Sequence, residues 1–262
     1  MNNQATMEKM SRMKLHGMCR AFQATMETSL QKKFTADELL AHIIDAEWDD
    51  RHNRKINRLI HAAKFRYQAS IEEIDFQRKR NLDKNMVLRL SDCGWVTKSQ
   101  DITVTGPTGA GKSFIASALG YQSCRFGFRT LYFNCAKLFS LLKYAKADGS
   151  IIKHINNIQK QDVLILDDFG LHPVDTQVSL LLLEILEDRH GRKSTIIASQ
   201  FPVGKWHGIV GEPTIADAIC DRIIHSSFRI EMKMDGDSLR KDYCRKTEQE
   251  KAVSKTKEKR RN

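Results

Sequence analysis

The stretch that decides the fold reads GPTGAGKS, from Gly106 to Ser113. An apolar and β-branched run, residues 102–105, precedes it, and residues 114–125 carry apolar side chains at helical spacing. A strand, a glycine-rich loop and a helix in this order direct backbone N–H groups and the positive end of a helix dipole at an anion. The stretch therefore predicts a phosphate-binding loop at the start of a parallel α/β fold.

Each position of this loop suits the binding of a nucleoside triphosphate with Mg²⁺. Glycines allow successive N–H groups to turn toward phosphate oxygens, Lys112 can reach the β- and γ-phosphates, and the Ser113 hydroxyl can hold Mg²⁺. A complete motif between a strand and a helix is more specific than a glycine-rich turn alone. We expect ATP phosphates to bind the loop made of Gly106, Pro107, Thr108, Gly109, Ala110, Gly111, Lys112 and Ser113.

A second motif reads VLILDDFG at residues 163–170. Its apolar run, 163–166, is typical of a strand buried on both faces, and it places Asp167 and Asp168 at the carboxyl end of that strand. Asp167 is expected to organise Mg²⁺ together with Ser113, and Asp168 to accept a proton from the attacking water as general base. The two motifs together predict an ATP site at one edge of a sheet.

Strands and helices alternate from residue 101 onward, which indicates a three-layer α/β fold with a parallel sheet. We expect strands at 101–105, 130–134, 163–167, 194–199 and 228–232, and helices at 112–126, 135–146, 176–190 and 213–225. Gln200 directly follows one of these strands, so its side chain could orient the hydrolytic water or sense the γ-phosphate. An ordinary polar residue at a strand end fits the same spacing.

Composition places these motifs in a chain of two domains. The 262 residues are 41% hydrophobic, enough for one large core and a smaller module. The six cysteines form no C-x-x-C pair, so they are interpreted as reduced thiols without a metal site. Since no stretch of eighteen apolar residues occurs, we expect a cytoplasmic protein with no membrane partner.

The part of the chain before the first strand is expected to be a small, almost wholly helical domain. All four prolines follow residue 105, and the first hundred residues contain only two glycines. Thr35 and Glu38 have the spacing of a helix capping box. We therefore expect a helical domain at 1–95, a nucleotide domain at 96–242 and a basic, disordered tail at 243–262.

The formal net charge of the chain is +11. Most of this excess positive charge lies in the two flanks, before residue 96 and after residue 238. This distribution is expected if the flanks contact a polyanion while the centre binds nucleotide. In the helical domain, Arg51, Arg54, Lys55 and Arg58 recur at three- and four-residue steps and could contact DNA phosphates. A solvated helix face gives the same pattern, so both interpretations stay open.

Longer stretches carry a resemblance to a known family. They are GPTGAGKS, ILDDFG, EDRHGRKSTIIASQFPVGKWH and GEPTIADAICDRIIHSSFRIEMKMDGDSLRK, with LHGMCRAF, DAEWDDRHNRKINRLIHAAKFRY and the IDF of residues 74–76 in the helical part. The chain closely resembles the IstB-like ATP-binding proteins, helper ATPases of bacterial insertion sequences, from about residue 10 to 242. The EPT, ADAI and DR-x-x-H segments are more specific than the phosphate loop, which many families share.

The resemblance implies an AAA+ ATPase of the initiator and helicase-loader branch, related to DnaC. It implies ATP-dependent homo-oligomers on duplex DNA, delivery of that DNA to a partner transposase, and a bacterial protein associated with the nucleoid when bound to DNA. Position by position, it places sensor one at Gln200 and an arginine finger, acting on a neighbouring subunit, at Arg222. Most AAA+ proteins have Asn and Glu where this chain has Gln200 and Asp168, and the shorter Asp168 suggests slow hydrolysis suited to an assembly switch.

Two further arginines and two alternative functions remain open. Arg240 stands where a second sensor is sought, and Arg189 is a second interface candidate, although cations are also favoured at helix C-termini. A helicase loader would use the helical domain to bind a helicase and would prefer single-stranded DNA. A small-molecule P-loop kinase would need an acceptor pocket and a lid, for which the sequence offers no evident segment.

Overall fold

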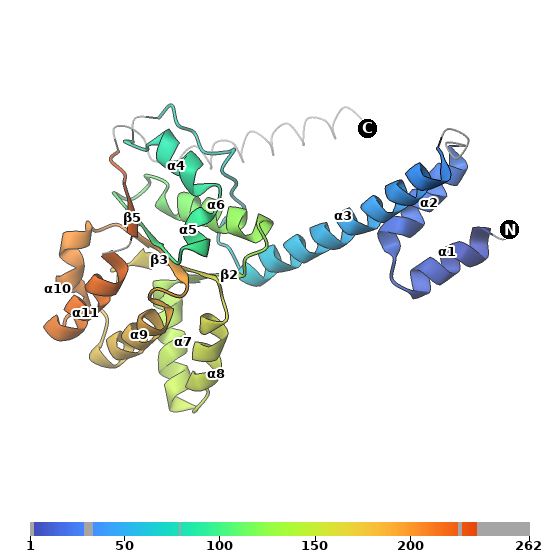
Figure 1. Cartoon of the computed structure of the whole chain (residues 1–262). Helices are drawn as coiled ribbons and strands as arrows, with labels where there is room; N and C mark the ends of the chain where they lie inside the picture. The colour runs from blue at the N-terminus through green and yellow to red at the C-terminus, as the bar shows by residue number, and fades with distance from the viewer. Residues whose placement is uncertain (1–2, 29–33, 79, 225–226, 235–262) are drawn as a thin grey trace, which may run out of the picture. The chain divides into compact units, whose positions relative to one another are not determined.

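A computed structural model describes residues 3–28, 34–78, 80–224 and 227–234 of the chain (Figure 1). Its contacts divide the chain into two compact units, residues 1–59 and residues 60–262. The division therefore comes before the expected domain boundary at residue 95. Arg240 and the expected tail at 243–262 lie outside the described residues.

The first unit consists of helices. These are α1 (Asn3–Arg12), α2 (His16–Glu27) and α3 (Ala36–Ala63), whose last residues belong to the second unit. The expected capping box begins α3, because Thr35 N donates to Glu38 Oε2 at 2.8 Å and Glu38 N donates to Thr35 Oγ1 at 3.3 Å. Glu47 of α3 accepts the backbone N–H of Gly17 at 2.8 Å, which joins α2 to α3.

The second unit contains a five-stranded parallel sheet in the order β2-β3-β4-β1-β5. Its strands are β1 (Asp101–Thr105), β2 (Thr130–Asn134), β3 (Val163–Phe169), β4 (Ser194–Ser199) and β5 (Ser227–Glu231). Strand β1 lies between β4 and β5, so the loop that follows it is at the carboxyl edge with a strand on either side. This position is where doubly wound sheets bind ligands.

Helices cover both faces of the sheet (Figure 1). Two separate apolar cores result, one beneath α4, α5 and α6 and the other beneath α7, α8, α9 and α11. The helices are α4 (Lys84–Leu90), α5 (Gly94–Thr97), α6 (Lys112–Arg125), α7 (Cys135–Ala147), α8 (Ile151–Gln159), α9 (Thr176–Arg189), the 3₁₀ turn η2 (Val203–Lys205), α10 (Trp206–Val210) and α11 (Pro213–Ile224). The predicted three-layer α/β class is confirmed.

The expected strands and the four expected helices of this unit are all present, with ends shifted by two residues at most. Helices α8 and α10 were not expected. Much of 64–83 is not helical and packs on the sheet, because Ala69, Ile71 and Ile74 are buried in the same core as α6. Among the described residues, no helix is long and apolar enough to cross a membrane.

Candidate functional site

The loop GPTGAGKS has the backbone geometry that phosphate binding requires. Gly111, directly before α6, has φ of 99°, which a residue with a side chain rarely adopts. At Gly106 a Cβ atom would meet the carbonyl oxygen of Met232 at 2.4 Å, so β5 and the loop approach too closely for any side chain. Both glycines are therefore needed to form the loop beside the sheet edge.

Lys112 and Ser113 begin α6, where the helix dipole favours anions. Lys112 is 6% exposed, and its Nζ donates to the carbonyl oxygen of Pro107 at 2.9 Å, so the ammonium group lies over the loop. Ser113 Oγ donates to Asp167 Oδ1 at 2.9 Å. The two motifs, separate in sequence, therefore meet through a direct hydrogen bond.

Asp167 is a deeply buried carboxylate with a second partner. It is 1% exposed, and Tyr132 Oη of β2 donates to its Oδ2 at 2.5 Å. Burial raises the pKa of Asp167, while the hydrogen bonds from Tyr132 and Ser113 act in the opposite direction. A hydroxyl and a carboxylate oxygen that converge at a phosphate loop are the hard donors that Mg²⁺ takes alongside phosphates, so these residues fit the ion.

Asp168 is turned out of the regular strand geometry. The β3–β4 register shifts between Leu166 and Phe169, and Asp168 has φ of 58°. This bulge changes the direction of the Asp168 side chain, which is 17% exposed. Asp adopts such a positive φ more readily than most residues. Asp168 Oδ2 accepts hydrogen bonds from Asn134 Nδ2 at 2.9 Å and from Arg66 Nη1 at 3.1 Å.

Gln200 is joined to the loop. Thr108 Oγ1 donates to Gln200 Oε1 at 2.6 Å. The end of β4 is therefore connected to the residues that would surround the phosphates. The contact places the Gln200 side chain beside the phosphate loop, and its role as a γ-phosphate sensor stays a prediction.

Arg222 lies away from these residues. Helix α11 follows the carboxyl end of β4 and leads back toward the start of β5. Arg222 is in the last turn of this helix. It therefore lies at the amino edge of the sheet, opposite the edge that carries the phosphate loop. There it pairs with Glu187, and its Nη1 donates to Ala218 O at 2.9 Å. The structure thus brings Ser113, Asp167 and Asp168 together but leaves Arg222 out of its own chain's site.

The model of the IstB-like ATP binding protein family matches residues 8–247. The chain belongs to this family. An insertion sequence ATP-binding protein of Sinorhizobium fredii, named as y4pL, is 39% identical over 92% of this chain and 98% of that protein. The IS21 ATP-binding protein of Pseudomonas aeruginosa is 27% identical over 88% and 86%.

Solved structures show the fold of this IstB-like chain to be that of AAA+ P-loop proteins. A crystal structure of DnaI matches with a TM-score of 0.55 and 21% identity, covering 67% of this chain and 93% of that chain. AMPPCP-bound DnaA from Aquifex aeolicus matches with a TM-score of 0.56 and 18% identity, covering 67% and 53%. The expected AAA+ fold is confirmed.

Arg189 of the IstB-like chain is a structural residue. It is 1% exposed, and its guanidinium donates to carbonyl oxygens of Ile158, Gln161 and Ser194. Burial lowers the pKa of Arg189 to about 10. Because its donors are used within its own chain, Arg189 is not an interface group, contrary to one of the two interpretations of the sequence.

The four basic residues of α3 differ in their partners. Arg51 Nε lies 2.6 Å from Glu47 Oε1, and Arg54 Nε lies 2.7 Å from Asp50 Oδ2. Within the described part of the chain, Lys55 and Arg58 have no carboxylate at ion-pairing distance. These two residues therefore carry most of the free positive charge of this stretch.

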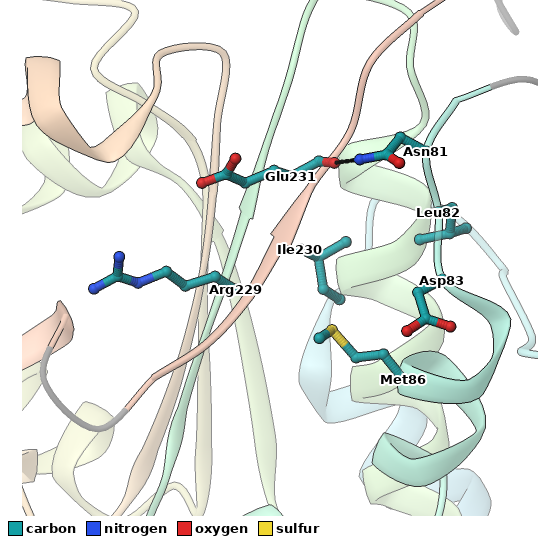
Figure 2. Close-up of a pocket in the computed structure, with 7 residues that line it drawn as sticks. All are labelled: Asn81, Leu82, Asp83, Met86, Arg229, Ile230 and Glu231. Carbon is teal, nitrogen blue, oxygen red and sulfur yellow. Dashed lines mark hydrogen bonds between the residues drawn. The ribbon is translucent and has the colours of Figure 1, made fainter.

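A pocket of about 400 Å³ lies beside β5 (Figure 2). It is lined by Asn81, Leu82, Asp83, Met86, Arg229, Ile230 and Glu231. Residues that flank the two lining segments contact the phosphate loop: Arg80 Nη1 donates to Ala110 O at 3.2 Å, and Met232 O would lie 2.4 Å from a Cβ atom at Gly106. None of the residues expected from the sequence lines it.

Three residues that contact the acidic pair were not found from the sequence: Arg66, Tyr132 and Asn134. Asn134 ends the strand next to β3, and strand-end position alone could have indicated it. Tyr132 has the spacing of a core residue, and Arg66 follows a helix far away in sequence. No pattern in the sequence distinguishes these two from structural residues.

Proposed function

We propose that this protein is an ATPase that binds ATP with Mg²⁺ in the GPTGAGKS loop and hydrolyses it. The observation that carries the proposal is the convergence of Ser113, Asp167 and Asp168 at the start of α6, in a member of an ATP-binding family. Lys112 and the loop N–H groups bind the phosphates, and Ser113 and Asp167 hold Mg²⁺. When bound, the ion neutralises charge on the β- and γ-phosphates.

In the hydrolytic step, water attacks the γ-phosphorus, its proton passes to Asp168, and the bond to the ADP oxygen breaks. Gln200, held by Thr108, orients that water. A cation opposite the leaving group is still needed, and Arg222 is at the far edge of the sheet. We therefore infer that Arg222 acts on the site of a neighbouring copy and that a homo-oligomer is the active form.

We further propose that ATP controls assembly on duplex DNA and that the assembly recruits a transposase. Two observations support this: the relatives are named as insertion sequence proteins, and the flanks of the chain are basic. The short side chain of Asp168 suits slow turnover, in which nucleotide state, rather than rapid hydrolysis, sets the affinity for DNA.

The test is ATPase activity of the purified protein with duplex DNA, with single-stranded DNA and without DNA. We expect stimulation by duplex DNA, and binding that weakens with salt by a log–log slope of about 0.9 per phosphate contacted. A clear preference for single strands would favour the helicase-loader alternative. Transfer of phosphate from ATP to a metabolite, in the absence of DNA, would favour the small-molecule kinase alternative.

A further inference from the structure

Arg66 places a positive charge on the two carboxylates of the site. Its Nη1 lies 3.1 Å from Asp168 Oδ2 and 3.9 Å from Asp167 Oδ2. All three residues belong to the second unit. Nothing in the function proposed above requires a cation there from the same chain.

The position of Arg66 is fixed by its two neighbours. Phe65 and Tyr67 are packed against the core beneath α6, and the Arg66 guanidinium lies 5.4 Å from the centre of the Tyr67 ring. Lys64, with φ of 58°, ends α3 one residue after Ala63. Arg66 is therefore held on the ATPase sheet and lies three residues beyond the helix that begins in the first unit.

A bound Arg66 opposes both tasks assigned to the acidic pair. Oδ2 of Asp168 accepts from Arg66 and Asn134, so this oxygen is not free to take a proton from water. A guanidinium within 4 Å of Asp167 also repels a second cation at that carboxylate. Displacement of Arg66 would remove the cation from both carboxylates and leave Asp168 Oδ2 with the single hydrogen bond from Asn134.

We propose that Arg66 is a positioning residue that restrains Asp168 and competes with Mg²⁺ at Asp167, and that movement of α3 relieves this restraint. Because α3 joins the first unit to Arg66, binding of that unit to duplex DNA would be transmitted to the hydrolytic step. The inference rests on the proposed ATPase function and adds a regulator within the same chain.

The test uses the full chain with Arg66→Ala and Arg66→Lys. We expect Arg66→Ala to raise turnover without DNA about two- to fivefold, the range for a partly exposed ion pair, and to reduce the stimulation by duplex DNA. A fluorescent ATP analogue should bind Arg66→Ala at a lower Mg²⁺ concentration than it binds the wild type. Arg66→Lys keeps the charge and should be intermediate.

Arg125→Ala is the matched control, because Arg125 is an exposed arginine of the same unit whose Nη1 lies 3.2 Å from Glu72 Oε1. It should leave turnover and Mg²⁺ dependence unchanged. The inference would be overturned if Arg66→Ala had the turnover and Mg²⁺ dependence of the wild type. It would also be overturned if turnover fell while the analogue still bound. Neither result would contradict the proposed ATPase function. A wild-type chain that binds no ATP would instead contradict the proposed function.

Discussion

Asp168 is the residue on which the proposed hydrolysis depends. The bulge in β3 and the positive φ bring its carboxylate to Asn134 and Arg66, while Asp167 stays buried beside Ser113. Two adjacent carboxylates thus receive different environments from one irregularity in the strand. This arrangement suits an ion ligand followed by a general base.

Asp168→Asn is expected to abolish turnover and keep nucleotide binding. The amide has nearly the same shape but cannot accept the proton, and loss of a general base typically costs about 10²–10⁴-fold in rate. ATPase assays beside binding of a fluorescent ATP analogue will measure the two effects separately. Hydrolysis at the normal rate by this variant would show that the base is another group.

Asp101 should make stability depend on pH. Burial raises the pKa of Asp101 from 3.8 to about 7, opposed by the hydrogen bond from Thr195 N and the charge of Arg189. Between about pH 4 and 7 the folded chain then binds more protons than the unfolded chain, so the free energy of unfolding falls as pH rises, by at most about 4 kcal/mol.

Asp101→Asn removes this titration and can still accept from Thr195 N. Denaturant unfolding at several pH values should show a flatter profile for the variant than for the wild type across this range. Parallel profiles would mean that Asp101 titrates normally in the folded chain.

Sequence reasoning predicted residues that follow a motif and missed residues defined by packing. Gly106 to Ser113 have a fixed spacing because the phosphate loop requires it, and Asp167 directly follows a buried apolar run. Arg66 reaches the same site from a distant segment, and its role depends on where Phe65 and Tyr67 pack. Such a contact is set by tertiary structure and leaves no local pattern.

At the scale of elements, buried strands were predicted most accurately because their apolar runs are short and bounded. The end of α3 was missed because residues 64–83 contain neither glycine nor proline to mark it. Helix α10 depends on tertiary packing: Trp206 lies edge-on to Phe169 with ring centres 4.9 Å apart. Short helices of this kind have little intrinsic stability.

The basic stretch of α3 yields a prediction because its cations differ in their partners. The double substitution Lys55→Ala, Arg58→Ala should weaken duplex binding and reduce the log–log salt slope by about 2, if both contact phosphates. The matched pair Arg51→Ala, Arg54→Ala removes residues already paired with Glu47 and Asp50 and should change the slope less. Equal slopes in both variants would show that ion pairing does not decide DNA contact.

At the scale of the whole molecule, we propose that a neighbouring chain completes the site. The phosphate loop and the acidic pair lie at one edge of the sheet, and Arg222 lies at the other. Copies can be arranged so that the edge with the phosphate loop in one chain faces the edge with Arg222 in the next. Each site except a terminal one would then have an Arg222 from its neighbour. Sequence alone indicated an arginine finger only through family resemblance, since Arg222 has the spacing of any helix-surface arginine.

Mixing two inactive variants tests this arrangement. Asp168→Asn subunits keep Arg222, and Arg222→Ala subunits keep Asp168, so a mixed oligomer contains some sites with both groups. We expect partial recovery of ATPase activity on mixing, while each variant alone remains inactive. A verified mixed oligomer without recovery would place the finger elsewhere.

The central claim is that nucleotide binding in the GPTGAGKS loop drives assembly on duplex DNA. Sedimentation of the wild type with duplex DNA and a non-hydrolysable ATP analogue measures this most directly, with Lys112→Ala as the control. Our account predicts large DNA-bound oligomers that require the analogue and are absent with Lys112→Ala. Assembly of equal size without nucleotide, or with Lys112→Ala, would contradict it.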